Sequence, residues 1–278
     1  MILAVMFLFI TQAVTAQVLI SAKDFVAETK NDKSIVVIDA NTADNYSKSH
    51  VMGAVNVPHL ELYKDGEIKG LIQSTQDLAA YFGGKGISNT SNIILYDDGS
   101  NKYSSRVYWI LDYLGAKNLR ILHKDMDEWK VARVPLTRNP SATKAVTFTP
   151  SVNASVIAQA SDVKACSGNC IIVDARELAE YNGTSEKPVS VGHIKGAVNL
   201  NYKDLLDDKG AFKTKEQIKA IAEKNGLTPD KTIITYCETS VRAAVVYVAL
   251  KKILGYPNVK VYDGAYNEWK AQGNPMEK

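Results

Sequence analysis

Short runs of β-branched residues recur along the chain, and longer segments of mixed polarity separate them. In the C-terminal half these runs are residues 171–173, 232–235 and 259–261. Residues 243–254 lie between the last two runs and are long and apolar enough for a buried helix. Strands that alternate with helices pair in parallel and are covered on both faces. The pattern predicts an α/β fold built of three-layer α/β/α domains, each with a mainly parallel central sheet.

The same pattern occurs twice along the chain as an internal repeat. Residues 35–58 contain I-V-V-I-D-A and later G-A-V-N, and residues 171–199 contain I-I-V-D-A-R and later G-A-V-N. Downstream, three pairs of landmarks are each 140 residues apart: Asp97 and Cys237, Gly115 and Gly255, Trp129 and Trp269. We therefore expect two related domains, residues 17–133 and 151–278. A linker at residues 134–150, which contains Pro135, Pro140 and Pro150, joins them.

The N-terminus differs from the rest of the chain. Residues 1–16 carry no charge, residues 2–10 are an unbroken apolar run, and Val14-Thr15-Ala16 supplies the small residues that a signal peptidase reads. The segment is short for a transmembrane span. We expect a signal peptide at residues 1–16, a periplasmic or secreted protein, and no membrane span after its removal. A buried first strand or helix is the alternative.

The net charge and the sequence motifs argue against several classes of function. The chain has 33 Lys and Arg against 30 Asp and Glu, a net charge of +3 without a clustered basic stripe, which does not favour nucleic acid or a membrane surface as partner. The four histidines have no metal-ligand spacing, and no dinucleotide or P-loop motif occurs. We expect neither a metal nor another cofactor.

The chain has three cysteines. Cys166 and Cys170 enclose only Ser-Gly-Asn, so they could pair with each other or remain two ordinary thiols. Cys237 then has no pairing partner within the chain. A free thiol in an oxidising compartment indicates a functional role.

Cys237 lies where a nucleophile is expected. An apolar strand ends at Tyr236 and a helix begins a few residues later, so the thiol sits at the carboxyl end of a strand, where α/β sheets bind ligands. A helix N-terminus and the nearby Arg242 would stabilise a thiolate, and Ser240 could cap the helix or donate to the sulfur. The neighbouring Glu238 opposes the thiolate. We expect an exposed, nucleophilic cysteine; a small buried core residue is the alternative.

These residues resemble the rhodanese family. The family's six-residue loop between strand and helix is matched by C-E-T-S-V-R, from the catalytic Cys237 through the loop residues Glu238, Thr239, Ser240 and Val241 to Arg242. Further matches are Asp174-Ala175-Arg176, the G-H-I-K-G-A of residues 192–197, and residues 262–269, with Ala265 in place of a second glycine. The tandem arrangement resembles thiosulfate and 3-mercaptopyruvate sulfurtransferases, in which the inactive first domain carries Asp in place of Cys, as Asp97 does here.

The resemblance implies an enzyme that carries sulfane sulfur as a persulfide on Cys237. We expect thiosulfate as the donor, cyanide or a thiol as the acceptor, and a monomer that acts on these small molecules. Arg106, Arg176 and Arg242 are the implied substrate-binding residues, because guanidinium groups bind oxyanions. The loop has neither the basic residues of vertebrate thiosulfate users nor the Gly-Ser-Gly of mercaptopyruvate users.

Three alternatives follow. The protein could be a 3-mercaptopyruvate sulfurtransferase or a non-catalytic rhodanese-like sulfur-binding or sensor module. A Cys-based phosphatase is disfavoured, because four residues rather than five separate Cys237 from Arg242.

Overall fold

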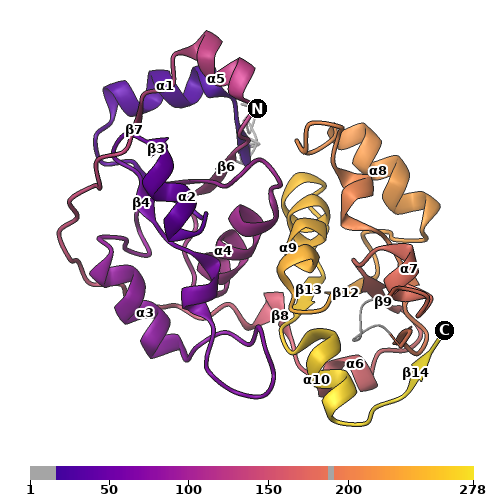
Figure 1. The fold of residues 1–278 in the computed structure, drawn as a ribbon. Helices are drawn as coiled ribbons and strands as arrows, with labels where there is room; N and C mark the ends of the chain where they lie inside the picture. The colour runs from indigo at the N-terminus through magenta and orange to yellow at the C-terminus, as the bar shows by residue number, and fades with distance from the viewer. Residues whose placement is uncertain (1–16, 187–190) are drawn as a thin grey trace, which may run out of the picture.

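The computed structural model describes residues 17–186 and 191–278. The predicted signal peptide lies outside these residues. Two α/β domains stand side by side, the first in indigo to magenta and the second in orange and yellow (Figure 1).

Each domain contains a five-stranded sheet in which every pairing is parallel, as the apolar runs predict. The first sheet has the order β1 (Leu19–Ile20), β6 (Leu119–Leu122), β5 (Ile93–Tyr96), β2 (Val36–Asp39) and β4 (Val55–Asn56). The second has the order β8 (Ile157–Ala158), β13 (Val259–Tyr262), β12 (Thr232–Tyr236), β9 (Cys170–Asp174) and β11 (Val198–Asn199). The two orders are equivalent, which confirms the repeat.

Helices cover the sheets. The first domain contributes α1 (Ala22–Asn31), α2 (Ala43–Lys48), η1 (His59–Leu62), α3 (Thr75–Gly84), α4 (Lys102–Tyr113) and α5 (Met126–Ala132). The second contributes η2 (Ala154–Val156), α6 (Ala160–Lys164), α7 (Leu178–Tyr181), η3 (Tyr202–Leu205), α8 (Lys215–Lys224), α9 (Val241–Tyr247), η4 (Val248–Ile253) and α10 (Ala265–Ala271). Ser and Thr caps begin several of them: the Ser74 hydroxyl accepts from the Asp77 amide ahead of α3, and Thr214 forms a capping box with Gln217 ahead of α8.

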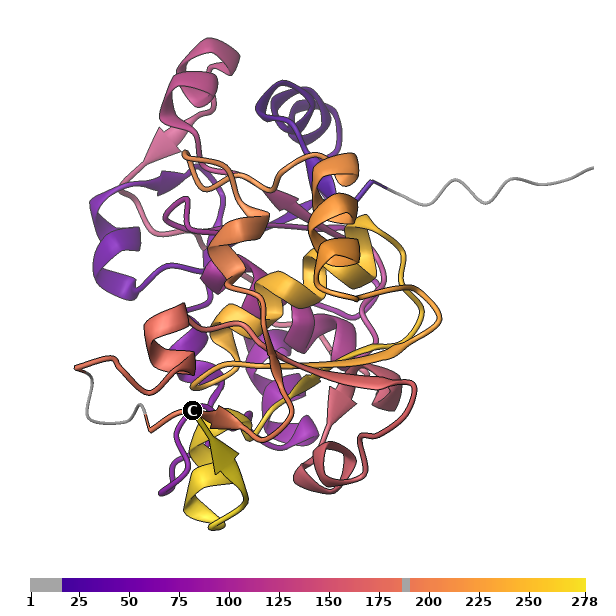
Figure 2. The same ribbon diagram turned by 90° about the vertical axis from the view of Figure 1, so that its right-hand side faces the viewer.

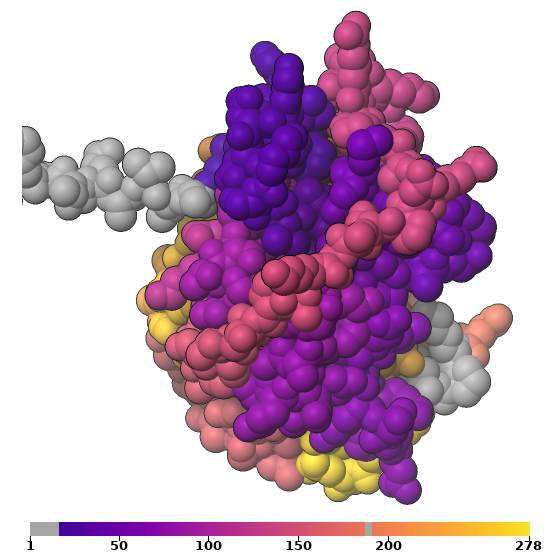
Figure 3. All heavy atoms as spheres, turned by 90° about the vertical axis from the view of Figure 1, so that its left-hand side faces the viewer, coloured from indigo at the N-terminus to yellow at the C-terminus, as the bar shows by residue number. Residues whose placement is uncertain are grey.

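Two small antiparallel ladders accompany the main sheets: β3 (His50–Val51) with β7 (Leu136–Thr137), and β10 (His193–Ile194) with β14 (Met276–Glu277). The chain ends at β14, in yellow in Figure 2. Strand β7 lies within the predicted linker, which runs as a rose band across the surface of the first domain (Figure 3). The linker is therefore tied to the domain that it leaves.

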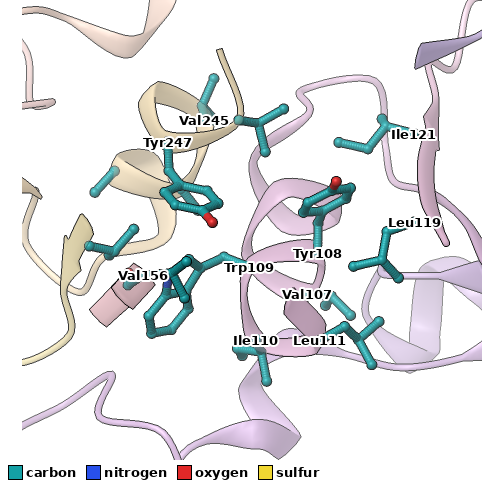
Figure 4. Packing of buried hydrophobic residues seen from close by; sticks show 14 of the residues in the cluster. Val107, Tyr108, Trp109, Ile110, Leu111, Leu119, Ile121, Val156, Val245 and Tyr247 are labelled. Atoms are coloured by element: carbon teal, nitrogen blue, oxygen red, sulfur yellow. The ribbon is translucent and has the colours of Figure 1, made fainter. Parts of the chain in front are cut away.

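The two domains meet through α4 and α9, which pack against each other. Val107 and Trp109 of α4 belong to the same buried cluster as Val245 and Tyr247 of α9 (Figure 4). The Trp109 indole also donates to the Val156 carbonyl of the second domain at 3.0 Å. Burial of this much apolar surface favours one docked arrangement of the domains.

The spacing between equivalent residues of the two domains changes by one residue at the start of the helix that follows each central strand. Asp97 and Cys237 are 140 residues apart, but the residues that precede α4 and α9, Asn101 and Ser240, are 139 apart. The first loop is thus one residue longer. The π-helical turn η4 takes up one extra residue in the second helix, so the register is restored by Gly115 and Gly255.

Among residues 17–186 and 191–278, no helix has the length and apolar character needed to cross a bilayer.

Candidate active site

Cys237 immediately follows β12, at the carboxyl edge of the second sheet. The loop continues through Glu238 and Thr239 to Ser240, whose backbone is left-handed with φ 62°, and α9 begins at Val241. The Cys237 carbonyl accepts from the Tyr266 amide at 2.9 Å, which fixes the start of the loop. The strand–loop–helix arrangement predicted from the sequence is confirmed.

Cys237 itself is only 1% exposed, so the expectation of an exposed thiol is wrong. The first domain covers the loop: a Cβ atom built on Gly70 would lie 2.6 Å from the Thr239 Cβ. Gly70 also has a left-handed φ of +93°, which favours glycine. Cys237 therefore lies at the interface between the domains.

Ser240 has neither of the roles that the sequence suggested. Its hydroxyl donates to the Tyr262 carbonyl at 2.5 Å and makes no capping hydrogen bond. The first hydrogen bond of α9 runs from the Ala244 amide to the Ser240 carbonyl. The amides of residues 241–243 therefore have no partner within the helix and remain as donors at the end of the loop.

Arg242 lies beside the cysteine and is held there by Glu180. Its Nη1 and Nη2 donate to the two Glu180 carboxylate oxygens at 2.5 and 3.0 Å. Burial alone would lower the pKa of this guanidinium, but the hydrogen bonds to Glu180 and charge on Cys237 raise it overall. Glu238 is 3.8 Å from Arg242, so its charge is partly offset by the same guanidinium.

Arg106 reaches the interface from α4 of the first domain and is fully buried. Its Nη2 donates to the Gly70 carbonyl at 2.9 Å and to the Asp263 carboxylate at 2.7 Å. The guanidinium lies 5.3 Å from the Tyr63 ring centroid and 4.6 Å from that of Trp109. Its Nε and Nη1 have no hydrogen-bond partner among the described residues. Since buried donors are normally paired, these two donors, which lie on different sides of the guanidinium group, are available to oxygens of a ligand.

Two tyrosines, one from each domain, interact electrostatically with Cys237. Burial raises the pKa of Tyr63 to about 12; charge on Cys237 adds to this rise, and Arg106 opposes it. Burial also raises the pKa of Tyr202, again with a contribution from Cys237. The Tyr63 hydroxyl is 2.8 Å from Nδ1 of His59, whose ring stacks on Tyr103.

The structure pairs Arg176 with groups of its own domain. Its Nε and Nη2 donate to the Asp174 carboxylate, and Nη2 also donates to the Gly192 carbonyl at 2.7 Å. The guanidinium also lies 4.3 Å from the Tyr266 ring centroid. Because these contacts already engage the guanidinium, the hypothesis that Arg176 binds substrate receives no support from this geometry.

The corresponding loop of the first domain encloses a carboxylate. Asp97 accepts from the backbone amides of four residues and from one hydroxyl. The donors are the amides of Gly99, Asn101, Tyr103 and Ser104 and the Ser104 hydroxyl, at 2.9 to 3.2 Å. This loop therefore directs its donors at a carboxyl group in the position that corresponds to the Cys237 side chain. Burial raises the pKa of Asp97, and the hydrogen bonds from the backbone amides oppose this rise.

Cys166 and Cys170 form a disulfide, with Cα atoms 5.2 Å apart, and Cys237 is the free cysteine. No group of three or more His, Cys, Asp or Glu side chains suited to a metal ion occurs in the described part of the chain.

Sequence reasoning missed Gly70, Tyr63, Glu180 and Asp263. Asp263 stands in the Tyr-Asp-Gly segment already noted as a motif, so its polar residue at a strand end was a usable signal. Gly70, Tyr63 and Glu180 had no such signal, because only the docking of two domains or of separate loops brings them to Cys237.

The domain family described as the rhodanese-like domain matches residues 21–132 and again residues 159–272. The chain therefore belongs to the tandem-domain rhodanese family of sulfurtransferases.

Its relatives include users of both donors. The chain is 30% identical over 272 residues to the 3-mercaptopyruvate sulfurtransferase of Escherichia coli K12, covering 91% of this chain and 96% of that one. It is 30% identical over 238 residues to the thiosulfate sulfurtransferase of Azotobacter vinelandii, covering 84% and 88%. The crystal structure of SseA from Escherichia coli matches with a TM-score of 0.80 at 27% identity, covering 90% and 99%. The protein is a sulfurtransferase, and these two relatives are equally similar to it.

Proposed function

We propose that the protein takes the outer sulfur of thiosulfate onto Cys237 and passes it to cyanide or a thiol. The Cys237 thiolate attacks the outer sulfur, the S–S bond of thiosulfate breaks, and sulfite leaves with the bonding electron pair. The acceptor then attacks the terminal sulfur of the persulfide. This step forms thiocyanate or an acceptor persulfide and returns the Cys237 thiolate.

The anion-binding loop of the first domain is the observation that carries this proposal. Asp97 shows that the fold of this loop directs four amides and a hydroxyl at one anionic group. The loop after Cys237 starts at the same strand end and also closes with a left-handed residue before the helix. A persulfide at Cys237 would place its charged terminal sulfur where Asp97 places its oxygens, and preorganised donors stabilise such charge.

The two arginines favour thiosulfate as donor. Arg242 brings a positive charge beside the sulfur, and Arg106 brings a second positive charge with two unpaired donors, Nε and Nη1. Thiosulfate is a compact dianion and gains more from both charges than mercaptopyruvate, which carries one carboxylate. The Glu238 side chain is 36% exposed and lies near Arg242, so solvent and this partner screen its repulsion.

Comparison of kcat/KM for thiosulfate and 3-mercaptopyruvate, with cyanide as acceptor, tests the choice of donor. We expect thiosulfate to be preferred. A clear preference for 3-mercaptopyruvate would overturn the choice of donor and leave Cys237 as the sulfur carrier.

We also propose that residues 1–16 direct export to the periplasm or the medium. The Cys166–Cys170 disulfide supports this proposal, because structural disulfides persist mainly in oxidising compartments. N-terminal sequencing of the protein isolated from its host should find Gln17 first. An intact Met1 in a cytoplasmic fraction would contradict export.

A further inference from the structure

We infer that Asp263 is a positioning residue that holds Arg106, and with it residues 70–72 of the first domain, over the Cys237 loop. This inference rests on the proposed role of Arg106 as a ligand of the sulfur donor.

Asp263 follows β13, the strand next to β12, and is therefore at the same sheet edge as Cys237. One carboxylate oxygen accepts from Nη2 of Arg106 at 2.7 Å, and the other accepts from the Ile72 amide at 3.0 Å. Both partners belong to the other domain. A single carboxylate of the second domain therefore fixes a side chain and a backbone segment of the first.

This contact determines which donors of Arg106 remain for a ligand. Nη2 is occupied by Asp263 and by the Gly70 carbonyl, so Nε and Nη1 remain as the two unpartnered donors among the described residues. The ion pair is almost fully buried, with side-chain exposures of 0% for Arg106 and 6% for Asp263. Removal of Asp263 would leave the guanidinium buried without its counter-charge, and Nη2 would keep only its hydrogen bond to the Gly70 carbonyl.

The repeat provides an internal comparison. The residue equivalent to Asp263 in the first domain is His123, 140 positions earlier. The His123 ring is hydrogen-bonded to the Asn101 side chain, which also donates to the Gly210 carbonyl of the second domain at 2.6 Å. Gly210 is in turn the equivalent of Gly70. The fold can thus join the domains at this point without an ion pair, and it places the ion pair on the side that contains Cys237.

A purely structural tie between the domains is the competing explanation, and the chain contains a matched control. Asp112 of α4 accepts from the Tyr247 hydroxyl and lies 2.8 Å from Nζ of Lys252, both in the second domain. Like Asp263, Asp112 is an interdomain carboxylate, but its partners are on α9 and η4, beyond the first turns that carry the loop. Asp112→Ala should lower stability without changing thiosulfate kinetics.

A double-mutant cycle on the full-length protein tests the inference. Arg106→Ala should lower kcat/KM for thiosulfate by about 10- to 100-fold, since it removes hydrogen bonds from a charged group. Asp263→Ala should raise KM for thiosulfate about tenfold while kcat changes less than about twofold, because only placement of the donor is affected. In the Arg106→Ala background, Asp263→Ala should have almost no further effect. If the double variant folds poorly, Asp263→Asn and Arg106→Lys close the same cycle.

The outcomes separate the two claims. If the losses in kcat/KM of the two single variants multiply in the double variant, the role of Asp263 is overturned and Arg106 remains a ligand of the sulfur donor. Wild-type kcat/KM in Arg106→Ala would overturn the proposed donor site and the inference with it. A KM effect of the same size in Asp112→Ala would assign both carboxylates to domain docking.

Discussion

Asp97 and Cys237 hold equivalent positions, each directly after the central strand of its domain. The Asp97 carboxylate is bound by its own loop, whereas the Cys237 thiol stands in a loop whose helix-end amides have no partner within the helix. In one copy of the fold the donors of the loop are thus used by its own carboxyl group, and in the other the helix-end amides remain for a ligand of the loop.

Replacement of Asp97 should affect stability and not catalysis. Asp97→Ala removes a carboxylate that accepts five hydrogen bonds and leaves buried amides unsatisfied, so we expect a loss of about 2–4 kcal/mol in the free energy of unfolding. Denaturant titration measures this loss, and kcat/KM for thiosulfate should change less than about twofold. An inactive Asp97→Ala protein of normal stability would contradict this view of the first domain.

Gly70 should be intolerant of any side chain. Gly70→Ala incurs left-handed strain and places a Cβ 2.6 Å from that of Thr239, so the loop must move, and displacement by about 1 Å can cost on the order of 100-fold in rate. Gly53 has a similar φ of +85° and open space around it, so Gly53→Ala isolates the strain. We expect Gly53→Ala to cost about 1–2 kcal/mol of stability with full activity. Equal activities of the two variants in a thiosulfate–cyanide assay would show that the contact with Thr239 is unimportant.

Acid should destabilise the protein through His59. Burial, with help from Arg106 and Lys102, lowers the pKa of His59 from 6.5 to about 4. As the pH falls, His59 therefore binds a proton in the unfolded chain at a higher pH than in the folded protein. Its stabilising contribution is complete above pH 6.5 and is lost as the pH falls toward about 4. The shift corresponds to at most about 3 kcal/mol. The free energy of unfolding of His59→Gln should depend less on pH in this window; an identical pH profile in the wild type would rule out this role of the imidazole.

Arg176 should matter for folding more than for substrate binding. Its hydrogen bonds to Asp174 and Gly192 are buried, and loss of one partner of a buried ion pair costs about 3–5 kcal/mol. Arg176→Ala should therefore melt at a lower temperature and, below that temperature, keep the wild-type KM for thiosulfate. A raised KM in a fully stable Arg176→Ala protein would restore Arg176 as a substrate ligand.

The sequence was sufficient for the parts of the molecule that local patterns determine. Continuous apolar runs and the 140-residue repeat predicted two parallel-sheet domains, and the run ending at Tyr236 predicted the loop of Cys237. Burial of Cys237, the pairing of Arg106 with Asp263 and the packing of Gly70 on Thr239 depend on how the domains dock, which no single segment encodes. The predicted role of the Ser240 hydroxyl was wrong for a related reason, since its acceptor, the Tyr262 carbonyl, belongs to the neighbouring strand.

Mass spectrometry of the protein after treatment with thiosulfate shows whether Cys237 carries the transferred sulfur. We expect one added sulfur on the peptide that contains Cys237, its removal by cyanide, and no addition in Cys237→Ser, which should fold normally because the change is nearly isosteric. Added sulfur on Cys166 or Cys170, or turnover retained in Cys237→Ser, would contradict a persulfide mechanism at Cys237.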